Sequence, residues 1–200
     1  QIRSSAASDV YKRQALENIT KAYNLREKYN FNPIDIAHSF KSFSELYFIW
    51  NMQEKGNLYL AKTDSINKLI QEQKSSTKFK DYDDLTFKLL DNYLGNCYEY
   101  KGEYLSNQKR YNQALEAYNK ASSYYGEFAF QKVSLINKKA NVYYMLAEYE
   151  NCLKAVEECI LLSKEQNLQK QIEIALELKI KALNKFCLLY TSPSPRDTNP

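Results

Sequence analysis

Apolar residues recur at steps of three and four along most of the chain, and this spacing predicts helices. The clearest apolar stripe, which gives one helix a continuous face for burial, consists of Ile36, Phe40, Phe43, Tyr47 and Trp50. Gly56 interrupts the pattern, and Leu58 and Ala61 resume it. Residues 34–71 are therefore predicted to form an antiparallel helical hairpin that breaks at Gly56.

Further helices follow from the same spacing and from end signals. Asn32 is suited to cap a helix, and Pro33 fits its first turn. The polar residues 71–80 indicate a loop, and Gly126 indicates a connection between units. Helices are predicted for residues 15–29, 83–108, 130–147, 149–164 and 168–186, and one begins near Tyr111. No apolar run approaches the roughly 18 residues of a membrane helix, so we expect an all-α chain of about eight helices without a membrane span.

A segment near the middle of the chain has a second, weaker copy. RYNQALEAYNKA at residues 110–121 corresponds to EYENCLKAVEEC at residues 148–159, with a constant offset of 38. The matching positions are Tyr111, Ala114, Tyr118 and Ala121 in the first copy, and Tyr149, Cys152, Val156 and Cys159 in the second. A fixed period of this size indicates helical units that must stack, because none can bury its apolar face alone.

The two ends of the chain are interpreted as foreign to the fold. DVYKRQ at residues 9–14 and CLLYTS at residues 187–192 can be encoded by inverted copies of one DNA element. Their flanks, SSAAS and PSPRD, also resemble translated sequencing-library adapters. We therefore expect residues 15–186 to be an internal fragment of a longer protein, with 1–14 as an adapter artefact that can still extend the first helix. Residues 187–200 are expected to form a disordered tail.

Charge and cysteine content bear on the class of function. Without the four basic and two acidic adapter residues, the formal charge falls by two from +4, so it does not favour a nucleic-acid surface. Cys97, Cys152 and Cys159 are an odd number without the spacing of a secreted domain. This pattern favours a reducing, cytoplasmic compartment.

Gly102, together with Tyr111, Ala114, Tyr118 and Ala121, resembles the tetratricopeptide repeat (TPR). In that family, small residues let paired helices approach, and aromatic residues fill the gaps between units. The second copy has Ala140 at the glycine position. The resemblance implies a right-handed α-solenoid of antiparallel helix pairs. Its units are longer and less regular than the usual length of about 34 residues, since successive small positions at Ala15, Ala61, Ala114 and Cys152 are 46, 53 and 38 residues apart.

The repeat can also be aligned to this chain in a second register. A second segment that resembles the opening of the repeat lies seven residues earlier and contains Leu94, Gly95, Tyr98, Gly102 and Tyr104. That register places Asn107 at a position that takes alanine. The later register is preferred because residues 110–121 satisfy every small position.

In the preferred register, the resemblance implies a concave surface on which a partner peptide or helix lies. Its inward positions are Asn96, Glu99, Glu103, Ser134, Asn137, Asn141 and Tyr144. Amides beside an aromatic suit a peptide backbone and an apolar anchor; the alternative is that these are ordinary solvated helix faces. Family members that hold a terminal carboxylate use a lysine and an asparagine one turn apart. Asn141 matches that asparagine, but Asn137 replaces the lysine, so carboxylate binding is not expected.

Patterns typical of catalysis are weak. His38 is the only histidine, lies in an apolar stripe, and cannot build a zinc site with scattered cysteines. The glycines form no phosphate-binding loop. Glu157 and Glu158 are adjacent on a helix and point in different directions. We therefore expect no enzyme activity, no cofactor and no metal.

The sequence predicts a non-catalytic scaffold for protein–protein interaction. The alternative is a regulatory TPR region of a larger enzyme or signalling protein whose catalytic domain lies outside these residues. Tyrosines next to basic residues also raise the possibility of RNA binding. That hypothesis is less favoured, because many of the tyrosines fall at packing positions.

Overall fold

The computed structural model describes residues 2–29, 32–74 and 82–191, and within these ranges it contains eight α-helices and no strand. The helices are α1 (Ile2–Lys28), α2 (Pro33–Ile49), α3 (Gln53–Glu72), α4 (Asp84–Asn107), α5 (Tyr111–Tyr124), α6 (Ala129–Met145), α7 (Tyr149–Glu165) and α8 (Gln169–Thr191). The prediction of an all-α chain is confirmed. In the same ranges, no helix combines the length and apolar character needed to cross a bilayer.

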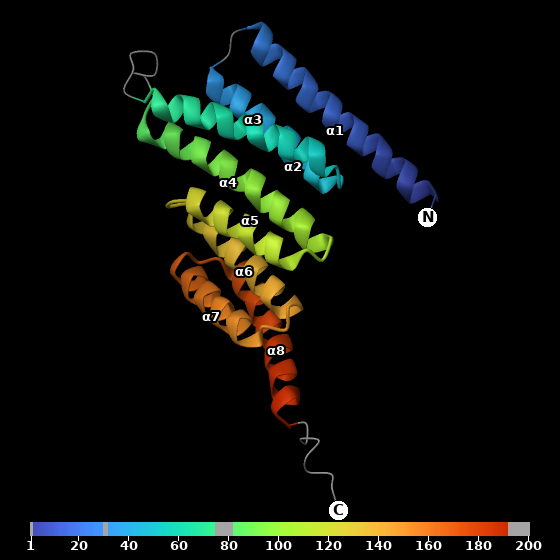
Figure 1. Cartoon of the computed structure of the whole chain (residues 1–200), viewed down its shortest axis with the longest axis vertical. Coiled ribbons are helices and arrows are strands. Elements are labelled where there is room, and N and C mark those ends of the chain that lie inside the picture. The colour runs from blue at the N-terminus through green and yellow to red at the C-terminus, as the bar shows by residue number, and fades with distance from the viewer. Residues whose placement is uncertain (1, 30–31, 75–81, 192–200) are drawn as a thin grey trace, which may run out of the picture.

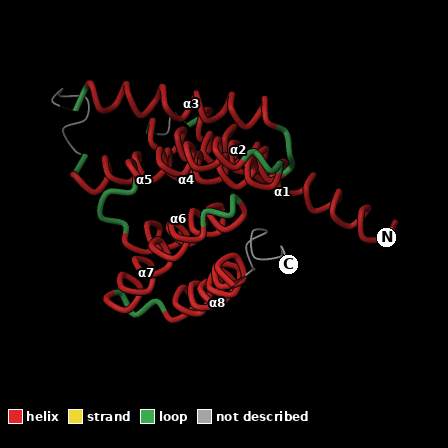
Figure 2. Tube along the Cα trace, turned by 60° about the horizontal axis from the view of Figure 1, so that its bottom comes forward, coloured by secondary structure: helices red, strands yellow, loops and turns green. Residues whose placement is uncertain are grey.

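The helices stack into an elongated body with α1 at one end and α8 at the other (Figure 1). Neighbours in sequence pack as the pairs α2–α3, α4–α5 and α6–α7. Alternate helices also touch: α2 packs on α4 and α6 on α8, whereas α4 and α6 meet only weakly. Figure 2 shows α1–α5 and α6–α8 as two successive groups. The space between these groups is where the candidate site lies.

One backbone motif closes four of the described connections. Its central residue has a positive φ of 55–60° and is Asn51, Lys109, Ala147 or Asn167. After Ala147, the Glu148 N–H donates to the Tyr143 carbonyl at 2.9 Å. This is the Schellman arrangement, which satisfies carbonyls at a helix end and reverses the chain in a short turn. The short turns hold consecutive helices antiparallel.

The starts of two helices carry side-chain caps. Asn32 Oδ1 accepts the Ile34 N–H at 2.8 Å, with Pro33 in the first turn of α2, as predicted. Asp83 Oδ1 accepts both the Thr86 N–H at 2.8 Å and its hydroxyl at 2.6 Å. Each cap satisfies N–H groups that have no partner inside the helix. The helices predicted from residue 83 to residue 164 are confirmed to within two residues at their ends.

The predicted break at Gly56 is wrong. The chain turns at residues 50–52, and Gly56 lies buried inside α3. A Cβ atom on Gly56 would lie 2.8 Å from the Phe48 ring, and the Ser44 hydroxyl donates to the Gly56 carbonyl at 3.0 Å. The glycine therefore permits close approach of α2 and α3. Ala61, which the sequence suggested as the small packing position, is exposed.

The outer helices are longer than their predicted ranges. α1 begins at Ile2 and so includes most of the segment interpreted as an adapter. α8 continues to Thr191, beyond the expected end at residue 186. Residues 192–200 of the expected tail lie outside the described residues. The origin of both ends stays a prediction.

Two glycines permit close approach of α4 and α5. A Cβ atom on Gly102 would lie only 2.4 Å from the Tyr118 ring, and one on Gly95 would lie 2.7 Å from the Tyr125 ring. Ala114 and Ala121 are fully buried in the same core. The α6–α7 core buries the smaller side chains of Ala140, Cys152, Val156 and Cys159, and tyrosines and leucines pack around them. Tyr111 and Tyr149 are half-buried beside these cores.

Candidate functional site

The candidate site is a groove of about 390 Å³ where α4, α6 and α8 approach one another beside Tyr118 of α5. Four of the sequence-predicted residues line it, namely Glu103, Ser134, Asn137 and Asn141. The lining residues that sequence reasoning missed are Ser106, Asn107, Tyr118, Lys138, Gln171 and Ile174. Most of the lining residues thus carry a hydroxyl or an amide group, and the exposed Ile174 adds an apolar contact.

Asn137 is the buried polar residue of the groove, with only 6% of its surface exposed. Its Nδ2 donates to the Gln171 carbonyl at 3.1 Å and to Gln171 Oε1 at 2.8 Å, which ties α6 to α8. Its Oδ1 is buried and has no hydrogen-bond partner. An unsatisfied buried acceptor costs about 1–3 kcal/mol. A ligand N–H that reached this oxygen would satisfy it.

Lys138 bridges α6 to two carboxylates of α4, Glu99 and Glu103. Burial lowers the pKa of Lys138, but the attraction of both carboxylates outweighs that effect and leaves its pKa raised. The Tyr125 hydroxyl also bonds Glu99 and lies 3.0 Å from Asn96 Oδ1. Asn96 and Glu99 thus belong to a polar network beside the groove and do not line it.

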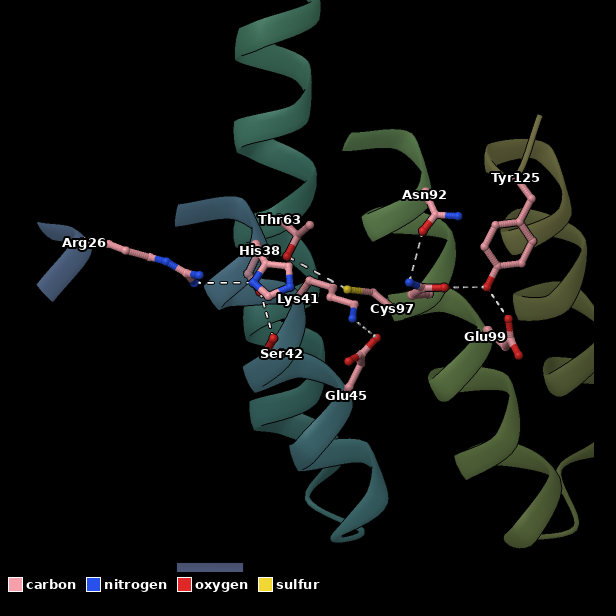
Figure 3. A network of polar contacts seen from close by, with 11 residues as sticks. Arg26, His38, Lys41, Ser42, Glu45, Thr63, Asn92, Cys97, Glu99 and Tyr125 are labelled. Carbon is pink, nitrogen blue, oxygen red and sulfur yellow. Dashed lines mark hydrogen bonds and ion pairs between the residues drawn. The ribbon is translucent and has the colours of Figure 1, made fainter. Parts of the chain in front are cut away.

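Glu45 on α2 extends this row of charges, and we call Glu45, Glu99 and Glu103 the acidic row. Lys41 Nζ lies 3.0 Å from Glu45 Oε1. Burial raises the pKa of Glu45, the Lys41 ammonium opposes the shift, and the other two carboxylates add to it. Figure 3 shows the Lys41–Glu45 pair between His38 on one side and Glu99 with Tyr125 on the other. Three carboxylates here face the ammonium groups of Lys41 and Lys138.

His38 has structural contacts. Its Nδ1 lies 3.4 Å from Arg26 Nη1 (Figure 3), and its ring meets Tyr93 edge-on at 5.2 Å. Burial, followed by Lys41 and Arg26, lowers the pKa of His38 and favours the neutral ring. Over the ranges that the structure describes, no three His, Cys, Asp or Glu side chains gather to hold a metal ion.

Three cysteines are buried, namely Cys97, Cys152 and Cys159. Burial raises the pKa of Cys97 to about 12 and that of Cys152 to about 11. A thiol needs its thiolate form to act as a nucleophile or a metal ligand. Both side chains therefore serve packing at neutral pH.

The last predicted site residues differ in exposure. Asn141 is exposed in the groove, and Ser134 is half-buried there. Tyr144 is not a lining residue, because its ring packs edge-on against Tyr149 at 5.8 Å near the α6–α7 turn. The spacing of four and three residues places Asn137, Asn141 and Tyr144 on related faces of α6. The Tyr144 ring nevertheless packs against Tyr149 next to the turn.

Comparisons with protein-family models, with curated proteins and with solved structures found no match to this chain. The structure alone defines its class, an α-helical protein built from stacked helix pairs with a polar groove across alternate helices.

Proposed function

We propose that the chain is a TPR-like, right-handed α-solenoid that binds an extended partner peptide in the groove between α4, α6 and α8. The observation that carries this proposal is the unpartnered Asn137 Oδ1, buried in a groove lined by amides and hydroxyls. A peptide backbone presents N–H donors for such an acceptor. The amides of Asn141 and Asn107 offer further contacts to backbone groups, and Ile174 offers an apolar one.

Two features support the TPR-like part of the proposal. The Gly102–Tyr118 contact brings together the small and the aromatic position of the preferred register. The Schellman turns at Lys109 and Ala147 are also separated by 38 residues, the offset of the sequence repeat. Side chains and backbone thus share one period across α4–α7.

The charges of the groove indicate what kind of peptide fits. Lys138 is already paired with Glu99 and Glu103, and Asn137 carries no charge. A terminal carboxylate would therefore meet an acidic neighbourhood without a free cation on the groove wall. We expect a peptide bound through internal residues, with neutral or basic side chains next to Glu103.

A peptide-display selection against the full chain tests this function. Selected peptides are then measured by fluorescence anisotropy against Asn141→Ala, Ile174→Asp and the control Asn119→Ala, an exposed site on α5. We expect at least about tenfold weaker binding, or about 1.4 kcal/mol, for the two groove variants and no change for the control. Equal affinities for all variants would exclude the groove.

Asn137 needs a different design, because its amide also joins α6 to α8. Asn137→Asp keeps the size and the acceptor but replaces the donating Nδ2 with oxygen. Circular dichroism and thermal unfolding are measured alongside binding to separate lost stability from lost affinity. Because aspartate keeps the acceptor, peptide binding should survive even where stability falls, and lost binding by a variant that melts like the wild type would contradict the proposed contact.

A further inference from the structure

A second cleft lies between α3, α4 and α5, on the opposite side of α4 from the groove. Lys101 and Glu103 are two residues apart, a rotation of about 200° around a helix, and each lines a different one of the two sites. The cleft has a volume of about 220 Å³. Sites for drug-sized molecules usually span about 300–1,000 Å³, so this cleft fits a smaller group.

Three cations converge on the cleft: Lys101, Arg110 and Lys120. Glu116 is the only acidic residue in its lining, so the lining carries an excess of two positive charges. Among the described residues, none of the three cations forms an ion pair, whereas Lys138 is paired with carboxylates. Burial, and then repulsion from Lys120 and Arg110, lowers the pKa of the half-buried Lys101. The positive charges of the cleft are therefore not compensated.

Hydrogen bonds leave donors available to a ligand in this cleft. Gln53 Oε1 lies 3.2 Å from both the Tyr104 hydroxyl and Arg110 Nη1, each of which can donate to it. With its oxygen engaged, Gln53 offers its amide N–H₂ to another acceptor. Lys120 Nζ is placed 5.5 Å from the centre of the Tyr98 ring.

The start of α5 adds to the positive potential. α5 begins directly after Arg110, with no side-chain cap and no acidic residue in its first turn. The first N–H groups of a helix carry partial positive charge and attract anions. Gln113 of this first turn lines the cleft. The start of α5 therefore lies beside the three cations.

We propose that the cleft binds a phosphoryl group, a compact dianion whose charge matches the excess of the lining. Arg110 supplies planar paired donors, and the two lysines supply point charges, the combination typical of phosphate recognition. This site is separate from the peptide groove and does not depend on it.

NMR titration of the full ¹⁵N-labelled chain with inorganic phosphate, at constant ionic strength and pH 7, tests the site. We expect saturable shifts of the backbone amides of Lys101 and of the first turn of α5, and a rise in the Lys101 pKa on binding. Lys101→Met keeps most of the aliphatic stem and removes the charge, so affinity should fall at least about tenfold. Its melting temperature should not fall, because neighbouring cations oppose the Lys101 charge.

Lys170→Met is the matched control, an exposed lysine on α8 that does not line the cleft. It changes the net charge equally and should leave phosphate affinity unchanged. Equal weakening by both variants, shifts that never saturate, or identical shifts with chloride would overturn the proposal. A phosphoserine peptide that binds more tightly than inorganic phosphate assigns the group to a phosphorylated side chain, and equal affinity assigns it to free phosphate.

Discussion

The pairs α2–α3 and α4–α5 both reach close helix contact with a glycine against an aromatic ring, but the two pairs place these residues on opposite helices. In α2–α3 the ring of Phe48 is on the first helix and Gly56 on the second. In α4–α5 Gly102 is on the first helix and the ring of Tyr118 on the second. Close packing requires a small residue opposite the ring, and either helix can carry it. A sequence pattern that assigns the glycine to one helix therefore recognises only one of the two pairs.

The α6–α7 pair dispenses with both glycine and aromatic ring at these positions. Ala140 and Val156 are buried in one cluster, at the positions of Gly102 and Tyr118 in the sequence repeat. Both residues are intermediate in size. The comparison indicates that a larger residue at the small position accompanies a smaller partner, so the two side chains change together.

The largest expected effect comes from replacing the Gly102–Tyr118 combination of α4–α5 with the Ala–Val combination of α6–α7. Tyr118→Val leaves a cavity beside Gly102 and should cost about 3 kcal/mol, while Gly102→Ala should cost about 2 kcal/mol through overpacking. The double variant recreates the Ala–Val combination of α6–α7 and should cost clearly less than the sum. Urea unfolding of all four proteins measures the coupling. Additive losses would show that volume is not shared between the two positions.

Ala121→Leu tests the same core with one substitution. Ala121 is fully buried between α4 and α5, so a larger side chain should cost about 1–3 kcal/mol through strain. Lys120→Ala, at the exposed neighbouring position, should change stability by about 0.5 kcal/mol or less. If chemical denaturation finds both substitutions equally mild, the proposed packing register fails.

Glu45, on α2, should make the stability of the protein depend on pH. Burial raises its pKa above the ordinary value of 4.5 in the folded state, so the native protein holds this proton more tightly than the unfolded chain. Its contribution to stability is therefore lost as pH rises from about 4.5 through the raised folded value. Glu45→Gln should raise the melting temperature at pH 7, and the difference from wild type should vanish near pH 4. A constant difference at all pH values would contradict this explanation.

The smallest expected effect concerns the turns. Ala147 has a φ of 60°, a conformation that glycine adopts without steric cost. Ala147→Gly should therefore stabilise the protein by about 1 kcal/mol, as measured by thermal unfolding. Asn51→Gly is the comparison, because asparagine tolerates the same φ better, and its gain should be smaller. A loss of stability in both variants would show that the side chains contribute more than the backbone.

Much of the fold was predictable because its signals are local. The helices from α4 to α7 follow from spacings of three and four residues and from the 38-residue offset. The cap at Asn32 was also readable from two adjacent residues. The break predicted at Gly56 was wrong, because the sequence alone does not show whether a glycine ends a helix or lies within it against an aromatic ring. Only the position of Phe48 against Gly56 distinguishes these cases.

The candidate groove was predictable only in part. The spacing on α6 identified Ser134, Asn137 and Asn141, because residues three or four apart share a helix face. Gln171 and Ile174 were missed, because no sequence period connects α8 to α6. Tyr144 was placed on the same face, but its ring packs against Tyr149 instead.

The sequence by itself determined where the helices form and how the central units repeat, because helix periodicity and capping act over a few residues. Tertiary structure alone decided that Asn137 ties α6 to α8 and keeps an unpartnered oxygen, and that Lys101, Arg110 and Lys120 meet in one cleft. Both arrangements join side chains from separate helices. Their geometry depends on how neighbouring units stack, and that stacking follows from the combined shapes of many buried side chains.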